Sequence, residues 1–126
     1  MYLLEWSMTD VRVREPLPLR HKNEPCCGVV GAPSLSTGQT ATLAERLKAI
    51  ADPTRLRMLD LLAQQPEPLC VCDITPLFPQ NQPTISHHLR LLREAGLIDT
   101  EKRGIWAHYW ATDAGRSALA ALQVLT

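Results

Sequence analysis

Four cysteines, in two closely spaced pairs, are the residues of this chain best suited to metal or redox chemistry. Cys70 and Cys72 are separated by one residue, and Cys26 and Cys27 are adjacent. Thiolate sulfur is a soft ligand that selects soft ions. In a reducing compartment, closely spaced thiols favour metal binding or redox chemistry over a structural disulfide. The sequence therefore predicts a thiol site built from these four residues.

Length and composition limit what can surround such a site. The chain has 126 residues, of which 45% are hydrophobic, so one domain with a small core is expected. Its formal net charge is zero, so any contact with nucleic acid must come from a local patch or from a dimer. No apolar run reaches the ~20 residues of a membrane span, and the stretch 1–6 is too short for a signal-peptide core. We expect a cytoplasmic protein with reduced cysteines and no membrane association.

The chain divides near residue 39. Residues 1–39 contain several prolines and glycines and show no apolar period, which predicts a flexible N-terminal arm. The arm carries Cys26 and Cys27. Residues 40–126 show helical and strand patterns, and we expect them to form one folded domain.

The first part of this domain predicts two helices. Thr42–Glu45 has the pattern of a capping box at the start of a first helix. Asp52 can cap a second helix, and Pro53 suits its first position. This second helix is apolar on most sides, so we expect it at the centre of the core.

The remainder predicts a short third helix, a turn, a long fourth helix, a hairpin and a last helix. The expected ranges are 73–78, 79–82, 83–95, 97–102 with 105–111, and a helix capped by Thr112 or Asp113. Gly96 ends the fourth helix, and Arg103-Gly104 forms the hairpin turn. This order is that of a winged helix-turn-helix, a mainly α fold with a small β-hairpin.

In such a fold, the N-terminal polar residues of the fourth helix face base edges in the major groove. Amides can read adenine, and hydroxyl and imidazole groups contact bases or phosphates. The predicted contacts are Asn81, Gln82, Thr84, Ser86, His87 and Arg90, with Lys102 and Arg103 at the hairpin tip. We expect His88 to pack or cap within the domain, and we assign no role to His21 or His108.

Four segments carry a resemblance to a known family: Asp52–Leu56, Leu69–Asp73, Thr84–Leu89 and Leu92–Leu97. In order and spacing they resemble the ArsR/SmtB family of metalloregulatory repressors, over about residues 40–118. The resemblance implies that residues 40–126 are a domain for DNA binding and dimerisation, with a homodimer formed through the first and last helices. It also implies binding to an imperfect inverted repeat in double-stranded DNA and release when an inducer binds. The Cys-Val-Cys-Asp step is similar to the branch that responds to arsenic and antimony.

The chain departs from that branch at one position. Related arsenical sensors often carry a third cysteine three residues after the second, where this chain has Thr75. The third sulfur would then come from Cys26 or Cys27, in a manner similar to arm-completed sites of cadmium and lead sensors in the family. Three of the four thiols would ligate arsenic, or all four a larger or tetrahedral ion, within or between protomers. The zinc branch uses His and acidic ligands on the last helix, and residues 114–126 have none.

The sequence thus predicts a repressor, not an enzyme, that releases its operator when As(III) or Sb(III) binds cysteine thiolates, with no organic cofactor. Ligation would shift the first helix of the helix-turn-helix. Two alternatives of the same fold remain open: a cadmium- or lead-responsive repressor, and a thiol redox switch. A thiol enzyme such as an arsenate reductase is less favoured, because no phosphate-binding loop or base-paired nucleophile is visible.

Overall fold

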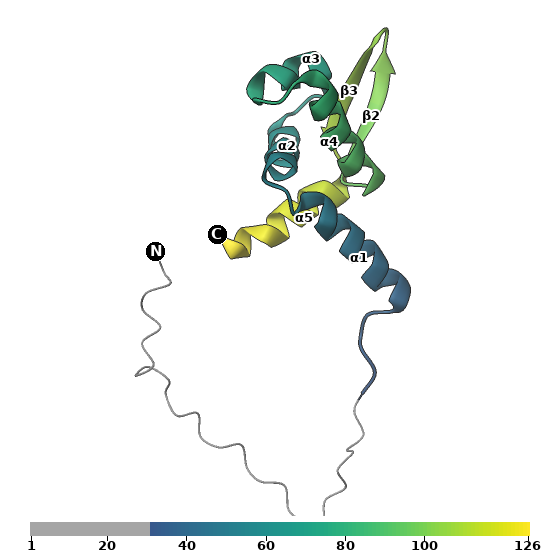
Figure 1. The fold of residues 1–126 in the computed structure, drawn as a ribbon. Coiled ribbons are helices and arrows are strands. Elements are labelled where there is room, and N and C mark those ends of the chain that lie inside the picture. Colours follow the sequence, from purple (N-terminus) through teal and green to yellow (C-terminus); the bar gives the residue numbers. More distant parts are fainter. Residues whose placement is uncertain (1–30) are drawn as a thin grey trace, which may run out of the picture. The chain divides into compact units, whose positions relative to one another are not determined.

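The structure, a computed structural model, describes residues 31–126 (Figure 1). Cys26 and Cys27 lie outside the described residues. The α-helices are α1 (Thr37–Ile50), α2 (Pro53–Gln64), α3 (Val71–Ile74), α4 (Gln82–Glu94) and α5 (Asp113–Leu122). The strands are β1 (Leu69–Cys70), β2 (Ile98–Arg103) and β3 (Trp106–Ala111). Two short 3-10 helices, η2 (Thr75–Leu77) and η3 (Gln123–Leu125), follow α3 and α5. The element order confirms the winged helix-turn-helix.

The helices begin where side chains can satisfy their first N–H groups. Asp52 accepts a hydrogen bond from the N–H of Arg55 at the start of α2, and Pro53 follows, as predicted. Thr112 caps α5 in the same way. Within residues 31–126, no helix is long and apolar enough to cross a bilayer.

The first helix begins earlier than the sequence predicted. Ser36 and Gln39 form a reciprocal capping box, so α1 begins at Thr37. The predicted cap residue, Thr42, lies inside the helix and donates a hydrogen bond to the carbonyl of Gly38. Both segments fit the capping-box pattern, and the upstream one determines the start.

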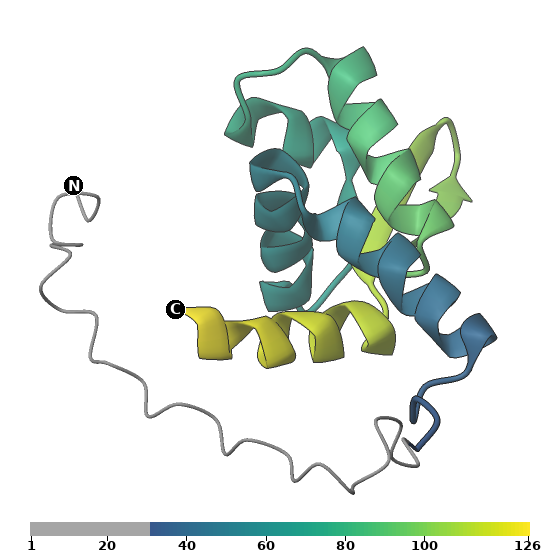
Figure 2. The same cartoon turned by 60° about the horizontal axis from the view of Figure 1, so that its bottom comes forward.

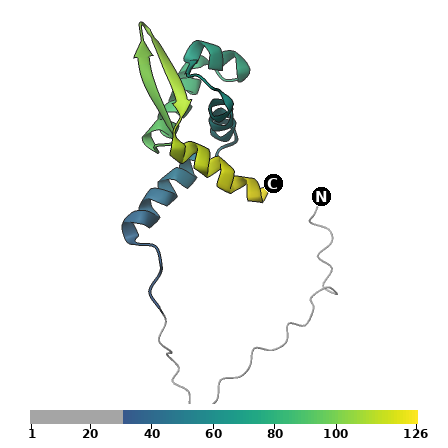
Figure 3. The same cartoon turned by 180° about the vertical axis from the view of Figure 1, so that it is seen from behind.

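The three strands form one antiparallel sheet in the order β1-β3-β2. The hairpin of β2 and β3, called the wing below, turns at Gly104, whose φ of 64° suits glycine. Figure 3 shows this hairpin extending away from α1 and α5. The short β1 was not predicted. It pairs with β3 so that Leu69 lies opposite Tyr109 and Cys70 opposite His108.

The core lies between α2, α4 and the sheet. Its fully buried side chains include Met58, Leu59 and Leu62 of α2 and Ile85, Leu89 and Leu92 of α4. Helix α1 packs on α2 and α4, and α5 packs on α2 (Figure 2). Helix α2 is therefore central, as its all-round apolar pattern predicted. This arrangement fixes α3, α4 and the wing relative to one another.

Candidate metal centre and nucleic-acid interface

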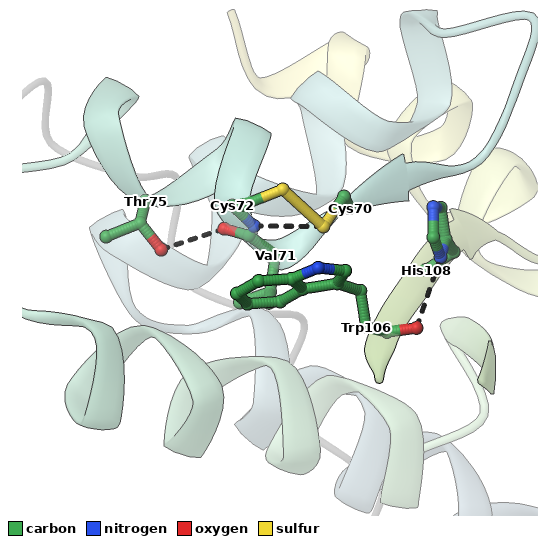
Figure 4. The surroundings of a disulfide bond; sticks show 6 residues. All are labelled: Cys70, Val71, Cys72, Thr75, Trp106 and His108. Carbon is green, nitrogen blue, oxygen red and sulfur yellow. Dashed lines mark hydrogen bonds between the residues drawn. A yellow bond between two sulfur atoms is a disulfide. The ribbon is translucent and has the colours of Figure 1, made fainter. Parts of the chain in front are cut away.

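Cys70 and Cys72, called the cysteine pair below, lie where β1 meets α3 (Figure 4). Cys70 is the last residue of β1 and the N-cap of α3, and its sulfur accepts a hydrogen bond from the Cys72 N–H at 3.3 Å. Cys70 is buried, whereas Cys72 is exposed. The exposed thiol gives a ligand or oxidant access to the pair.

The two sulfurs are joined as a disulfide in the structure, with the Cα atoms 5.1 Å apart. The sequence led us to expect reduced thiols. Residues in an extended strand and the following helical turn place their sulfurs on one side, and this Cα separation is ordinary for a disulfide. Metal binding at the pair therefore requires the reduced form, because only thiolates are ligands.

Asp73 is a third candidate ligand, which was not predicted from the sequence. The Cys70 and Cys72 sulfurs and an Asp73 carboxylate oxygen all lie within 4.8 Å of one another. Asp73 follows the cysteine pair directly, and this adjacency was the available signal. The donor set is two soft sulfurs and one hard oxygen, which suits a thiophilic ion with room for a further ligand.

Thr75 occupies the next turn of the chain after Cys72. Its hydroxyl donates a hydrogen bond to the carbonyl of Val71 at 2.8 Å, so its side chain is held against the helix that carries the pair (Figure 4). The residue at the expected third-cysteine position is thus beside the site but offers no sulfur. The predicted arm ligands Cys26 and Cys27 lie outside the described residues.

The wing strand β3 forms another side of this site. Trp106 and His108 lie in the surroundings of the cysteine pair, with the indole of Trp106 extending toward the pair (Figure 4). The Nδ1 atom of His108 is 3.3 Å from the carbonyl oxygen of Trp106. Neither residue was predicted to have a role, because no local sequence pattern links β3 to a cysteine more than thirty residues upstream.

Helix α4 presents most of the predicted DNA contacts to solvent. Gln82, Thr84, His87 and Arg90 are exposed, and Ser86 is half-buried. The Nη2 atom of Arg90 is 3.0 Å from Nδ1 of His87.

Asn81 has a structural role at the start of this helix. Its side-chain oxygen accepts the N–H of Thr84 at 3.0 Å and caps α4. Its amide N–H₂ group keeps its donors for another partner. Lys102 and Arg103 are exposed at the end of β2, where Arg103 pairs with Glu101 at 2.7 Å.

His88 lies on a different side of α4 from His87. Its Nδ1 is 3.3 Å from Nη1 of Arg55 in α2, and the side chain is half-buried. This contact confirms the prediction that His88 packs within the domain.

An exposed polar recognition helix, a helix-turn-helix and a β-hairpin wing define a winged-helix DNA-binding regulator. Comparison with known proteins identifies the family. The profile "Bacterial regulatory protein, arsR family" matches residues 52–100. The chain belongs to the ArsR family, whose members are transcriptional regulators and not enzymes.

Relatives and solved structures agree with this assignment. The chain is 47% identical over 70 residues to an uncharacterized HTH-type transcriptional regulator of Methanocaldococcus jannaschii, covering 56% of this chain and 78% of that one. It is 52% identical over 62 residues to the arsenical resistance operon repressor of Escherichia coli K12, covering 49% and 52%. The match therefore spans about half the length of that repressor.

Among solved structures, the homodimeric winged helix-turn-helix DNA-binding domain of a possible ArsR-family transcriptional regulator from Mycobacterium bovis is similar. It has a TM-score of 0.63 and 28% identity, with coverage of 77% of this chain and 89% of that one.

Proposed function

We propose that this chain is a repressor that leaves its operator when trivalent arsenic or antimony binds the cysteine pair together with a third thiolate from the arm, Cys26 or Cys27. One observation carries the proposal. The sulfurs of Cys70 and Cys72 meet at the first turn of α3, the first helix of the helix-turn-helix. A ligand bound there touches the DNA-binding element directly.

The chemistry follows from the donor set. Arsenite exchanges its hydroxyl groups for thiolates, and each arsenic–sulfur bond formed releases one water that carries the thiol proton. Two of these bonds come from the cysteine pair. Thr75 cannot supply the third, since its hydroxyl is a poor ligand for a soft ion and is hydrogen-bonded to Val71.

Ligation changes DNA affinity by moving α3. Cys72 is the second residue of α3, and Ile74 of the same helix is fully buried in the core. Displacing Cys72 therefore strains a packed helix that precedes the recognition helix α4. A typical coupling of about 1–3 kcal/mol corresponds to a loss of operator affinity of about 5–150-fold.

The test is fluorescence anisotropy with labelled DNA that the protein selects from a random pool, under reductant and with increasing arsenite. Wild type should release the DNA, and Cys70→Ser/Cys72→Ser should hold it at every arsenite concentration. Cys26→Ser/Cys27→Ser should respond only at much higher arsenite. Release by the Cys70→Ser/Cys72→Ser variant would contradict the proposal. An arm variant with the wild-type response would contradict the arm's part in it.

Two specific observations favour alternatives. The Asp73 carboxylate beside the pair suits cadmium or lead better than arsenic, since these ions accept mixed sulfur and oxygen ligands and larger coordination numbers. The disulfide of the pair suits a redox switch, in which one peroxide accepts two electrons from two thiols and becomes two waters. Release by Cd(II) but not arsenite would support the first. Release by peroxide, reversed by dithiothreitol, would support the second.

A further inference from the structure

The cysteine pair belongs to the same sheet as the wing. Cys70 ends β1, which pairs with β3, and β3 pairs with β2 to form the hairpin. Cys70 lies opposite His108, while Trp106, two residues nearer the tip, lies opposite Arg103. Cys70 and Arg103, a predicted DNA contact, therefore both pair with β3, Cys70 at His108 and Arg103 at Trp106.

The side chain of Trp106 extends from the wing strand β3 toward the cysteine pair (Figure 4), and the Trp106 backbone is in register with Arg103. The side chain is 44% exposed, so it is not part of the main core. A large aromatic group that is half outside the core can move without unfolding the domain.

The tip of the wing can follow such a movement. β1 pairs with β3 only at Tyr109 and His108, so Trp106 and Ala107 lie in a part of the hairpin with only two strands. A two-stranded ribbon is marginally stable alone and deforms at low cost.

We propose that Trp106 carries the signal of ligand binding from the cysteine pair to the wing, so that induction withdraws Lys102 and Arg103 from DNA phosphates. Trp106 is then a positioning residue, which acts on DNA through Arg103. This inference rests on the proposed function, since it requires a ligand at the cysteine pair. An ion bound to the sulfurs adds volume on the side of the indole that faces the pair (Figure 4), and the displaced indole moves the β3 backbone to which it is attached.

The test compares the ratio of DNA dissociation constants with and without saturating arsenite, under reductant. Trp106→Ala should lower this ratio about fivefold or more from the wild-type value, which for a typical coupling is about 5–150. Its arsenite affinity, measured by the sulfur-to-arsenic absorption band, should stay unchanged. Trp106→Phe should recover most of the ratio. Ile105→Ala is the matched control, because Ile105 is a neighbouring exposed wing residue and should leave the ratio unchanged.

A second measurement uses wild type and does not depend on a variant that folds. Log affinity falls linearly with log salt, and each lost phosphate contact lowers the magnitude of this slope by about 0.9. Withdrawal of Lys102 and Arg103 should therefore lower the magnitude of the slope by about 1.8 per protomer when arsenite binds. The same slope with and without arsenite would overturn the inference.

The outcomes separate the two proposals. If arsenite releases wild type and the ratio of DNA dissociation constants in Trp106→Ala equals that of wild type, the role of Trp106 is contradicted and the arsenite response stands. If the ratio for wild type is 1, both the arsenite response and the role of Trp106 are contradicted.

Discussion

At the scale of residues, the proposed need for a thiolate from the arm depends on Thr75, which stands where a third cysteine would complete the site. Thr75 follows Cys72 by one helical turn and is held at Val71. A sulfur at this position would lie beside the pair. The arm ligands would then become redundant.

We therefore predict that Thr75→Cys restores the arsenite response to the Cys26→Ser/Cys27→Ser protein. Arsenite-dependent release of DNA, measured by anisotropy, should return to the wild-type range. Thr75→Ser is the matched control and should not rescue, because it keeps the hydroxyl. No rescue by Thr75→Cys would show that the arm does more than supply a sulfur.

The predicted DNA contacts separate into two kinds by position. Gln82 in the first turn of α4 can reach a base edge, and Lys102 at the wing can reach a phosphate. Gln82→Ala should cost about 1–3 kcal/mol on the preferred site and less on unrelated DNA, which relaxes specificity. Lys102→Ala should weaken both DNAs alike and lower the salt slope by about 1. Competition binding with the two DNAs at several salt concentrations measures both effects, and equal loss on both DNAs for Gln82→Ala would exclude base reading.

The sequence predicted the cysteine pair and the packing of His88, but not the roles of Asp73 and Trp106 as neighbours of the pair. The place of Asp73 beside the pair could have been predicted, because it directly follows Cys72 in the sequence. Trp106 could not be placed, because its nearness to Cys70 depends on the register of β1 with β3, which pairs residues far apart in the chain.

At the scale of elements, Gly115 lets α5 pack closely against Leu97, the residue that precedes β2. The need for glycine at this position was not predicted from the sequence. Gly115 is buried, and a Cβ there would overlap the carbonyl oxygen of Leu97 and press on Leu59. Gly115→Ala should destabilise the domain by about 1–3 kcal/mol, as overpacking does.

The control for this prediction is Gly38→Ala. Gly38 lies in α1 with no atom within 4 Å of an added Cβ, so alanine should be neutral or stabilise by about 0.5–1 kcal/mol. Thermal or urea unfolding measures both variants. Equal stability of Gly115→Ala and wild type would mean that α5 can shift away from Leu97 without cost.

The cap of α2 gives a prediction for pH. The hydrogen bond from the Arg55 N–H lowers the pKa of Asp52 below its usual 3.8, so the folded state favours the carboxylate. The stability from this charge is present above pH 3.8 and is lost as the pH falls through the lower folded value. Asp52→Ala should cost about 1 kcal/mol at neutral pH. Asp52→Asn should keep the cap and remove this part of the acid dependence, as urea unfolding from pH 2 to 7 would show.

Most elements with strong local signals were predicted well, although the cap of α1 was misplaced at Thr42, and elements defined by distant partners were not predicted. The cap at Asp52 and the stop at Gly96 were predicted from the sequence, and Thr112 was one of the two predicted caps of the last helix. The two-residue β1 has no period to detect. Helix α3 begins at Val71, two residues before the predicted start, because Cys70 caps it. Thiol caps are outside the usual set of cap residues.

At the scale of the whole molecule, α1 and the C-terminal segment expose large apolar side chains. Leu43 and Leu47 on α1 are 43% and 55% exposed, and Val124 and Leu125 of η3 are 85% and 79% exposed. Both segments lie at the end of the domain opposite α3 (Figures 1 and 3). We therefore expect this chain to form a homodimer that buries them, as the resemblance implied.

Leu43→Gln/Leu47→Gln should raise the dimer dissociation constant about a hundredfold or more. Four leucines leave the interface, and burial of the exposed half of each is worth about half of the 1.5–3 kcal/mol of a whole leucine. Sedimentation velocity measures the change. Leu77→Gln, a change of the same type at an exposed leucine of η2, should leave the dimer intact. An unchanged dimer in the double variant would place the interface elsewhere.

If the cysteine pair binds metalloid as proposed, the disulfide between Cys70 and Cys72 adds a second control, namely the fraction of molecules whose pair is reduced. Under the proposed function, a molecule whose two sulfurs are bonded to each other cannot bind metalloid, so only molecules with a reduced pair respond. The apparent dissociation constant is then the intrinsic one divided by that fraction, and a population that is about 10% reduced needs about ten times more inducer. Under the proposed function, oxidative stress would raise the threshold at which a cell detects arsenic, with no change in the affinity of the site itself.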